Sequence, residues 1–267
     1  MNLEKLCIEV QEIARLAGAF IAGEREKFNH EDIEVKGKSD FVSYVDKQAE
    51  ELIVEGLRKL LPESGFIAEE GTGSSTGEKY KWIIDPLDGT TNFIHGMPPF
   101  AVSIALMEVE ELVLGVVYEI THDECFYAWK GSKAYLNGTA IKVSKAAKTS
   151  DSLIATGFPY SAFDMLECYV DSMRYFMTHS HGLRRLGSAA TDLAYVAAGR
   201  CEAFYEDGLK PWDVAAGAII VRQAGGKVCD FHGGDKFLFN GEIVASNGAY
   251  FDEFYNIVHK YFVNSHV

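Results

Sequence analysis

The sequence predicts an α+β fold in which helices and sheets lie in separate layers. Residues 3–27 and 43–61 carry apolar side chains at helical spacing, and residues 101–130 contain strand candidates with short connections. No internal repeat and no convincing linker interrupts the 267 residues, so we expect a single domain. It would consist of two closely packed lobes, roughly residues 1–145 and 146–267.

Two amphipathic helices open the chain. The first, over residues 3–27, is indicated by apolar residues three or four positions apart: Leu3, Leu6, Val10, Ile13, Ala17, Phe20 and Ile21. A polar stretch, residues 29–40, contains Lys36 and leads to the second helix, residues 43–61. Asp46 lies in the first turn of that helix, where an acid favours the helix dipole without any catalytic role.

Two short strand candidates follow, each with an acid at its end. Residues 65–68 are apolar and precede Glu69. Residues 82–84 are apolar and β-prone, which predicts a buried strand. Because Pro86 has no N–H for a sheet ladder, we expect this second strand to end at Asp85.

The rest of the chain alternates between strands and helices. An antiparallel meander is expected from strand candidates at residues 101–107, 112–119 and 125–130, with Asn137-Gly138 as a tight-turn signal beside them. Four further helices are expected at residues 164–178, 188–198, 212–224 and 251–262. Three further strands are expected at residues 201–205, 228–231 and 242–246. Gly199 and Gly225 follow two of these helices directly, as helix-terminating glycines commonly do.

Composition limits the classes of function. Hydrophobic residues make up 48% of the chain, which is enough for a sizeable core and argues against global disorder. Lys and Arg total 25 against 39 Asp and Glu, a formal charge of −14. Such an acidic chain is a poor general ligand for nucleic acid or an anionic membrane. It suits an anionic substrate only if cations change the charge of the site locally.

The cysteines and the N-terminal residues indicate a cellular compartment. The five cysteines are scattered, their number is odd and no C-x-x-C occurs, so neither a zinc site nor a disulfide framework is indicated. The first residues do not resemble a signal peptide, and no apolar run is long enough to cross a bilayer. We therefore expect a cytoplasmic protein.

The most informative stretch is residues 82–93, WIIDPLDGTTNF. Asp85 and Asp88 leave the end of one strand within a single turn, so their carboxylates can converge. Two like charges that close repel each other unless a proton or a cation lies between them, and Mg²⁺ prefers such hard oxygen ligands. Thr90 and Thr91 add hydroxyl and N–H groups that suit a phosphate. The alternative is an ordinary turn, since Asp, Pro and Gly are all turn residues.

Other acids stand in comparable places. Glu69 follows a strand, Glu206 ends the strand at residues 201–205, and Asp213 opens a helix. Each has an ordinary explanation as a solvated strand end or a helix-capping acid. Their combination matches phosphate ester hydrolysis, in which carboxylates hold the metal ions that activate water and stabilise the leaving oxygen. Thr90 and Asp46 could orient that water and accept its proton.

These residues resemble the inositol monophosphatases, members of a superfamily of Mg²⁺-dependent, lithium-sensitive phosphatases. Residues 82–93 are similar to the first family signature. Residues 212–217 (WDVAAG), continuing to residues 223–226 (QAGG), are similar to the second. The resemblance covers about residues 3–262 and is of the bacterial type. It implies a layered α/β/α/β/α sandwich, as in fructose bisphosphatases, and a homodimer.

The resemblance also implies roles for individual residues. The ligands of two or three Mg²⁺ ions would be Glu69, Asp85, the carbonyl oxygen of Leu87, Asp88 and Asp213. The catalytic residues would be Asp46, Glu69 and Thr90, with Thr90 and Asp46 orienting the attacking water. The substrate would contact Lys36, Asp88, Gly89, Thr90, Thr91, Gly187, Ser188, Ala189, Glu206 and Asp213.

Several substrates and one non-catalytic role remain open. The superfamily includes fructose-1,6-bisphosphatases, 3′-phosphoadenosine phosphate phosphatases and histidinol phosphatases. Nucleotide and histidinol phosphatases often have Lys or Arg where this chain has Thr91, so Thr91-Asn92-Phe93 favours an inositol monophosphate. Fructose bisphosphatase activity is the second interpretation. A non-catalytic regulator is a third, which the intact set of acids disfavours.

Overall fold

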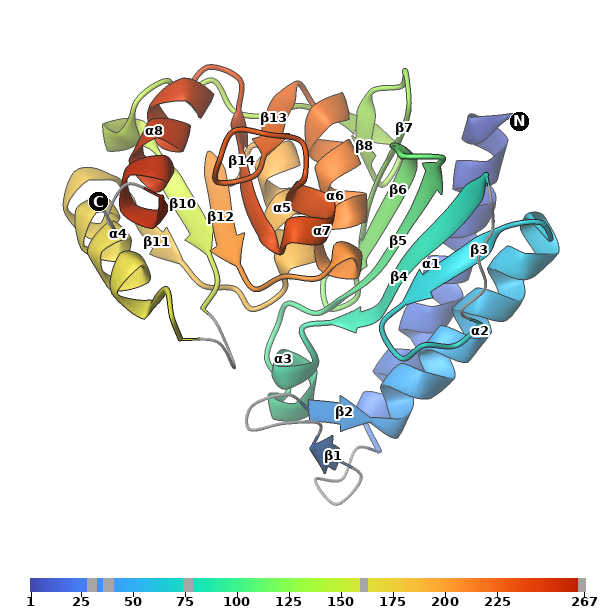
Figure 1. Ribbon diagram of the computed structural model, residues 1–267. Helices are drawn as coiled ribbons and strands as arrows, with labels where there is room; N and C mark the ends of the chain where they lie inside the picture. The colour runs from blue at the N-terminus through green and yellow to red at the C-terminus, as the bar shows by residue number, and fades with distance from the viewer. Residues whose placement is uncertain (28–32, 36–40, 74–78, 159–162, 264–267) are drawn as a thin grey trace.

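The computed structural model describes residues 1–27, 33–35, 41–73, 79–158 and 163–263, and Lys36 lies outside this part of the chain. Figure 1 shows five layers from right to left, an α/β/α/β/α sandwich. The helical layers are α1 (Leu3–Arg25) with α2 (Tyr44–Leu60), α5 (Ala189–Ala197) with α6 (Pro211–Gln223), and α4 (Leu166–His179) with α8 (Phe251–Phe262). Each helical layer contacts the sheet next to it. The expected sandwich is confirmed.

The first sheet has the strand order β3-β4-β5-β6-β7-β8-β9. Its strands are β3 (Gly65–Ala68), β4 (Tyr80–Asp88), β5 (Ala101–Glu108), β6 (Glu111–Glu119), β7 (Glu124–Trp129), β8 (Ala134–Leu136) and β9 (Thr139–Ile141). From β4 onward every neighbouring pair is antiparallel, which confirms the meander. Asn137 and Gly138 form the two-residue turn from β8 to β9, both with positive φ, as the sequence predicts.

The second sheet has the order β11-β10-β12-β14-β13. Its strands are β10 (Leu153–Thr156), β11 (Gly182–Arg184), β12 (Ala203–Asp207), β13 (Gly226–Cys229) and β14 (Glu242–Asn247). β10 pairs in parallel with both of its neighbours, whereas β14 pairs antiparallel with β12 and β13. β10 and β11 were not predicted from the sequence, because strands of three or four residues carry too little periodicity.

Other short elements were also not predicted. β1 (Ile33–Val35) and β2 (Phe41–Ser43) form an antiparallel pair. A 3₁₀ turn, η2, covers Thr149–Asp151, and α7 covers Phe237–Asn240. The short helix α3 (Thr90–His95) begins directly after the strand that carries the two aspartates. The sequence of this stretch predicts the tip of a turn, so the helix was not expected.

The predicted end of the central strand was wrong. β4 continues through Pro86 to Asp88. Asp85 is paired with Ser103 and Asp88 with Ala101, so β4 has one more residue than its partner between these two pairs. This extra residue is a β-bulge, and a bulge is one of the few places where a proline fits in a sheet, because the ladder is interrupted there. The bulge therefore allows a central strand to contain Pro86.

Three hydrophobic clusters fill the spaces between the layers. One lies between α1, α2 and the first sheet and includes Trp82. The second surrounds α5 and α6 between the two sheets and includes Leu193 and Ile220. The third lies between the second sheet and α4 with α8. The middle cluster positions the site, because it holds the N-termini of α5 and α6 close to the end of β4 (Figure 1).

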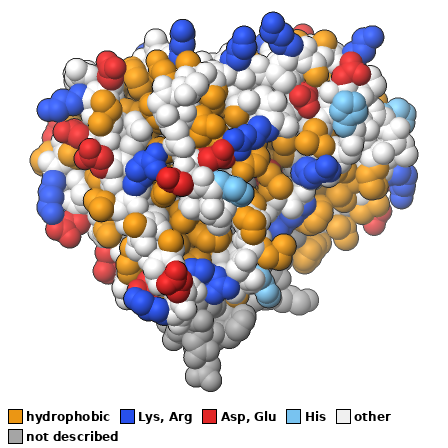
Figure 2. All heavy atoms as spheres, turned by 180° about the vertical axis from the view of Figure 1, so that it is seen from behind, with side chains coloured by type: hydrophobic (Ala, Val, Ile, Leu, Met, Phe, Trp, Pro, Cys, Tyr) orange, Lys and Arg blue, Asp and Glu red, His pale blue; other side chains and the backbone are white. Residues whose placement is uncertain are grey.

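The surface mixes both signs of charge. Figure 2 shows Lys and Arg side chains interspersed with Asp and Glu on the face opposite to Figure 1. Large exposed hydrophobic side chains occur on separate elements, for example Leu16 on α1 and Met177 on α4. Within the part of the chain that the structure describes, no helix is both long and apolar enough to cross a membrane.

Gly115 of β6 allows α6 to approach the first sheet closely. A Cβ atom at this position would lie 2.5 Å from Cγ2 of Ile219 and 2.7 Å from the carbonyl oxygen of Ala216. Both residues belong to α6. Since real Cβ contacts are longer than this, a side chain at Gly115 would move the helix away from the sheet.

We therefore expect Gly115→Ala to lower the free energy of unfolding by about 1–3 kcal/mol, the usual effect of overpacking. The control is Gly23→Ala in α1, where a Cβ would meet no atom within 4 Å. That change should raise the free energy of unfolding by up to about 1 kcal/mol, because alanine favours a helix. Urea unfolding of both variants measures the difference. Equal effects of the two substitutions would contradict this account of the α6 packing.

Candidate metal and phosphate site

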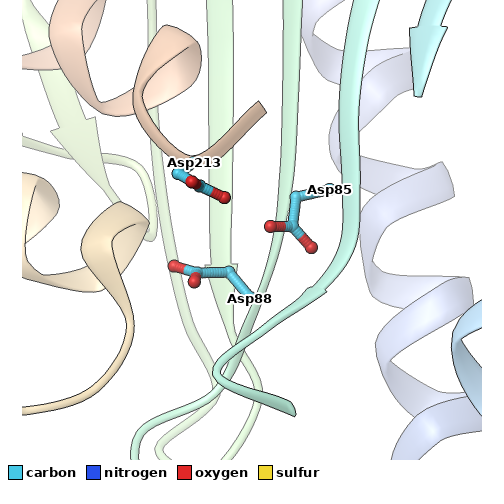
Figure 3. Close-up of side chains that lie close together, drawn as sticks. All are labelled: Asp85, Asp88 and Asp213. Atoms are coloured by element: carbon cyan, nitrogen blue, oxygen red, sulfur yellow. The ribbon is translucent and has the colours of Figure 1, made fainter. Parts of the chain in front are cut away.

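Three aspartates meet where β4 ends. Asp85 and Asp88 come from the two sides of the bulge in β4, and Asp213 lies in the first turn of α6. One carboxylate oxygen of each residue lies within 4.8 Å of one from each of the others. Figure 3 shows the three side chains pointing toward one another. The convergence of Asp85 and Asp88, and the place of Asp213 beside them, agree with the sequence analysis.

Asp85 is the most buried of the three, with 2% of its surface exposed. Its Oδ1 accepts a hydrogen bond of 2.9 Å from the N–H of Leu87, which fixes the orientation of the carboxylate. Burial raises the pKa of Asp85 well above its usual value, and the charges of Glu69, Asp88 and Asp213 raise it further. Without a cation, this carboxyl group is therefore stabilised in its protonated form.

Asp88 is held by the start of α5. Its Oδ2 accepts hydrogen bonds of 2.7 Å from the hydroxyl of Ser188 and of 2.7 Å from the N–H of Ala190. Burial raises the pKa of Asp88 to about 6, although these donors and the charge of Arg185 oppose the shift. Ser188 also caps α5, because its Oγ accepts from the N–H of Thr191. A single serine thus joins the second half of the chain to the end of β4.

Asp213 is held by the start of α6. Its Oδ2 accepts a hydrogen bond of 2.7 Å from the N–H of Lys210, as a helix-capping acid does. Burial is the main cause that raises the pKa of Asp213 to about 7, and the charge of Asp88 adds to it. The hydroxyl of Ser103 on β5 donates to the carbonyl oxygen of Trp212 at 3.0 Å, which ties this first turn to the first sheet.

The donor set fits a hard divalent cation. Carboxylate oxygens are the preferred protein ligands of Mg²⁺ and Ca²⁺. Burial is the main cause that raises the pKa of all three acids, and neighbouring acids add to it at Asp85 and Asp213, so the ionised forms are unfavourable in the folded protein. A cation between them would reverse this unfavourable electrostatic term. The cluster could therefore hold a metal ion.

Two further predicted residues, Glu69 and Asp46, are not members of this cluster. Glu69 follows β3 directly, and its N–H donates to the carbonyl oxygen of Ile84 on β4 at 3.2 Å. Among the described acids, Glu69 is not one of the three whose oxygens meet within 4.8 Å, but its charge contributes to the raised pKa of Asp85. Asp46 lies in the first turn of α2 with 2% of its surface exposed.

A glycine connects the cluster to α3. Gly89 has φ of 93° and is the N-cap residue of α3. A Cβ at Gly89 would lie 3.0 Å from the carbonyl oxygen of Pro99 and 3.2 Å from that of Gly187, so the backbones pass too closely for a side chain. The hydroxyl of Thr90 donates to the carbonyl oxygen of Leu87 at 3.0 Å. Thr90 and Thr91 are the first helical residues, whose N–H groups have no acceptor within a helix.

The side chain of Asn92 in α3 joins the two halves of the site. Its Nδ2 donates to the carbonyl oxygen of Pro99 at 2.8 Å and to that of Leu186 at 2.7 Å. Leu186 immediately precedes Gly187, Ser188 and the start of α5. Asn92 therefore fixes this segment relative to α3.

Glu206 faces the cluster from the second sheet. It lies on β12 with 7% of its surface exposed, and burial followed by the charge of Asp213 raises its pKa well above the usual value. A Cβ at Gly157, which follows β10, would lie 1.9 Å from Oε1 of Glu206. The carboxylate of Glu206 therefore lies against the backbone of Gly157, and only glycine leaves room for it. Gly157 was not among the residues predicted from the sequence.

Two charged residues of this region were also missed. The guanidinium of Arg185 lowers the pKa of Asp88, Asp192 and Glu206, and lies 5.6 Å from the ring centre of Phe158. Asp192 of α5 is buried, which raises its pKa well above the usual value. The pair Arg184-Arg185, close to Gly187 in an acidic chain, was the available sequence signal. Asp192 gave none, because an acid in the first turn of a helix is common.

Comparison with known proteins identifies the fold family. The profile of the inositol monophosphatase family matches residues 2–262. The chain is 45% identical over 235 residues to the protein called Nus factor SuhB of Escherichia coli K12, covering 88% of each chain. It is 42% identical over 236 residues to the inositol-1-monophosphatase of Mesorhizobium japonicum, again covering 88% of each. The solved inositol monophosphatase of Anabaena has a TM-score of 0.85 and 35% identity, with 97% of each chain covered.

We expect Asp85→Asn to stabilise the protein in the presence of a chelator. The substitution removes one of the mutually repelling charges and keeps the shape of the side chain. It should raise the free energy of unfolding by about 1 kcal/mol or more, the size of one pKa unit of interaction. In Mg²⁺ the original protein should gain more stability than the variant, because a ligand that binds only the folded state stabilises it. Thermal melting in chelator and in Mg²⁺ measures both effects.

The pH dependence gives an independent check. The folded pKa values of Asp88 and Asp213, about 6 and about 7, lie above the ordinary value of 3.8. Their contribution to stability is therefore present at low pH and is lost as pH rises from about 4 to about 7. Mg²⁺ should reduce this loss. The melting temperature in chelator should therefore fall over this interval, and it should fall less in Asp85→Asn than in the original protein. A melting temperature that rises, or that falls equally in both proteins, would contradict the repulsive cluster.

Proposed function

Because the chain belongs to the inositol monophosphatase family, we propose that it hydrolyses inositol monophosphates to inositol and phosphate in a Mg²⁺-dependent reaction. The observation that carries this proposal is the group of Asp85, Asp88 and Asp213, whose oxygens lie within 4.8 Å of one another beside the start of α3. Carboxylates at that spacing suit metal ions, and free N–H groups at a helix start suit a phosphate.

The acids would hold two or three Mg²⁺ ions. The ligands are Glu69, Asp85, the carbonyl oxygen of Leu87, Asp88 and Asp213. Bound there, the ions would supply the Lewis acidity that makes water nucleophilic near neutral pH and stabilises the leaving oxygen. Two ions would share Asp85 as a ligand, and the charges of Glu69, Asp88 and Asp213 that act on this residue support that role.

Other residues would bind the phosphate and move the proton. Gly89, Thr90 and Thr91 present N–H groups to the phosphate oxygens, and Lys36 attracts the anion. Thr90 and Asp46 orient the attacking water, and Asp46 accepts its proton. The burial of Asp46 supports this role, because a carboxylate shielded from bulk water keeps its orientation. Glu69 completes the catalytic set.

The inositol ring would lie against the wall formed by α5 and β12. The wall residues are Asp88, Gly187, Ser188, Ala189, Glu206 and Asp213. Carboxylates and N–H groups on one surface suit a ring of hydroxyl groups, which both donate and accept hydrogen bonds. The close fit of Glu206 on Gly157 supports a defined position for that carboxylate.

Two other activities use the same framework. Fructose 1,6-bisphosphate is the second candidate, and 3′-phosphoadenosine phosphate is the third. A regulatory role is a separate class, because relatives with 45% identity carry the name Nus factor SuhB. The complete set of acids favours catalysis over a purely regulatory function. We further infer a cytoplasmic homodimer that acts on a small molecule and not on nucleic acid or a membrane, from the acidic charge and the family resemblance.

The purified protein should release phosphate from inositol 1-phosphate at millimolar Mg²⁺ and release none in chelator. Fructose 1,6-bisphosphate and 3′-phosphoadenosine phosphate are assayed beside it, and kcat/KM should be highest for inositol 1-phosphate. The absence of phosphate release from all three substrates and from several other polyol phosphates would overturn the proposal. A higher kcat/KM for one of the other two would assign that activity instead.

We expect Li⁺ to inhibit the reaction. Li⁺ is small and hard, so it suits the oxygens of Asp88 and Asp213, but its single charge stabilises a leaving oxygen less than Mg²⁺ does. Initial rates at fixed Mg²⁺ should fall as Li⁺ rises to tens of millimolar, whereas equal concentrations of K⁺ should leave them unchanged. Identical rates in Li⁺ and K⁺ would argue against this site.

We expect Glu206→Ala to change substrate preference more than chemistry. Glu206 is not among the proposed metal ligands, so its loss should raise KM for inositol 1-phosphate by about tenfold, as for one lost hydrogen bond to a charged group. A small generic phosphate ester should be hydrolysed at nearly the original rate. Gly157→Ala should act in the same direction, because its Cβ displaces the carboxylate of Glu206. Equal losses for both substrates would contradict this role.

A further inference from the structure

Helix α2 contains a second buried acid, one turn after Asp46. Glu50 has 0% of its surface exposed, and Asp46 has 2%. Residues four positions apart lie on the same face of a helix, so the two carboxylates point from α2 into the same side of the protein. Burying a carboxylate is unfavourable unless hydrogen bonds compensate for the lost water. The partners of Glu50 therefore indicate what it does.

Both oxygens of Glu50 hold the backbone of the loop after β3. Oε2 accepts from the N–H of Glu70 at 2.7 Å, and Oε1 accepts from the N–H of Thr72 at 2.7 Å. Hydrogen bonds to an ionised carboxylate are short and stronger than neutral ones. Two of them on alternate residues fix the path of the segment. Glu69 immediately precedes Glu70, the first of the two donors.

The same loop packs against α2 at its far end. Gly73 has φ of 72°, and a Cβ there would lie 2.7 Å from Nη2 of Arg58 and 3.0 Å from Cγ1 of Val54. The guanidinium of Arg58 in turn lies 5.4 Å from the ring centre of Phe66 on β3. The loop therefore follows the surface of α2 closely over residues 70–73, and Glu50 provides its polar attachment.

Glu69 is thus fixed from two directions. Its own N–H is bonded to the carbonyl oxygen of Ile84 on β4, and the next N–H is bonded to Glu50. We propose that Glu50 is a positioning residue for Glu69, which it holds beside Asp85 by clamping the loop at Glu70 and Thr72. The role of Glu69 in this inference rests on the proposed function. The attachment of the loop to Glu50 rests on the two hydrogen bonds alone.

The physical reason for a clamp is electrostatic. Ala68 of β3 is paired with Ile84 of β4. Glu69 and Asp85 directly follow this pair, and two carboxylates this close repel each other when no cation is bound. An acid on a free loop would move away from that repulsion, and metal binding would then have to order the loop again. A loop held in place by Glu50 removes that ordering cost and keeps Glu69 in position for a cation. Loss of the clamp should therefore weaken metal binding.

The test compares Glu50→Gln with Glu51→Gln. Glu51 is the exposed neighbour on the same helix, so its substitution removes the same charge without touching the loop bonds. Glu50→Gln replaces one acceptor by an NH₂ group that faces an N–H. We expect the Mg²⁺ concentration for half-maximal activity to rise about tenfold or more in Glu50→Gln, and to stay unchanged in Glu51→Gln. The rate at saturating Mg²⁺ should return to within about threefold of the original, since the acids themselves are unchanged.

A second readout needs no substrate. Mg²⁺ alone should raise the melting temperature of Glu50→Gln less than that of the original protein and of Glu51→Gln. A purely structural role would lower the melting temperature of Glu50→Gln without changing the response to Mg²⁺. An unchanged response, together with an unchanged half-saturating Mg²⁺ concentration, would overturn the proposal.

A third measurement covers the case in which Glu50→Gln does not fold. In the original protein without Mg²⁺, the amides of Glu70 and Thr72 should already exchange slowly, because Glu50 holds both N–H groups before any cation binds. Rapid exchange of these two amides in the metal-free protein would overturn the clamp. Slow exchange without phosphate release from any substrate would support the clamp while contradicting the proposed function, so the two failures are distinguishable.

Discussion

The main physical constraint on the site is the repulsion among the carboxylates of Asp85, Asp88 and Asp213, which the fold holds together at one end of β4. At about 4 Å, two like charges in a partly buried site oppose each other by roughly 4 kcal/mol. The fold keeps the three carboxylates together in spite of this repulsion. The backbone N–H groups of Leu87, Ala190 and Lys210 each donate a hydrogen bond to one oxygen of one carboxylate. Orientation is therefore set before any cation binds, and the unfavourable energy is available to favour one.

The layered architecture is what brings these groups together. Asp85 and Asp88 come from the first sheet, whereas Ser188 and Asp213 come from the starts of the two helices between the sheets. The N-terminus of a helix carries a partial positive charge, so α5 and α6 partly offset the acids that they face. The close approach of α6 at Gly115 and the bonds of Asn92 across α3 keep these segments in register. The geometry of the site therefore depends on α5 and α6 in the middle layer as much as on β4.

The sequence predicts the parts of this arrangement that have a strong local signal. The long helices follow from apolar periodicity, the meander from successive strands, and the three aspartates from their positions at a strand end and a helix start. The bulge at Pro86 could not be predicted, because a proline ordinarily ends a strand and the extra residue of β4 is evident only from its pairing with Ala101 and Ser103. Gly157 and Glu50 could not be predicted either. Their roles consist of contacts with Glu206 and with the backbone of Thr72, which only the folded chain shows.

The two sides of the site have separate supports, and this separation has a consequence for specificity. Asp46 and Glu50 belong to α2, and Glu69, whose loop is bonded to Glu50, follows β3 of the first sheet. The wall that includes Glu206 belongs to β12 and rests on Gly157, which follows β10. Under the proposed function, substitutions in the wall would change which alcohol fits without moving the acids of the cluster. Relatives could then share the fold and the cluster while their substrates or added roles diverge, and the residues that decide the substrate would be those on α5 and the second sheet.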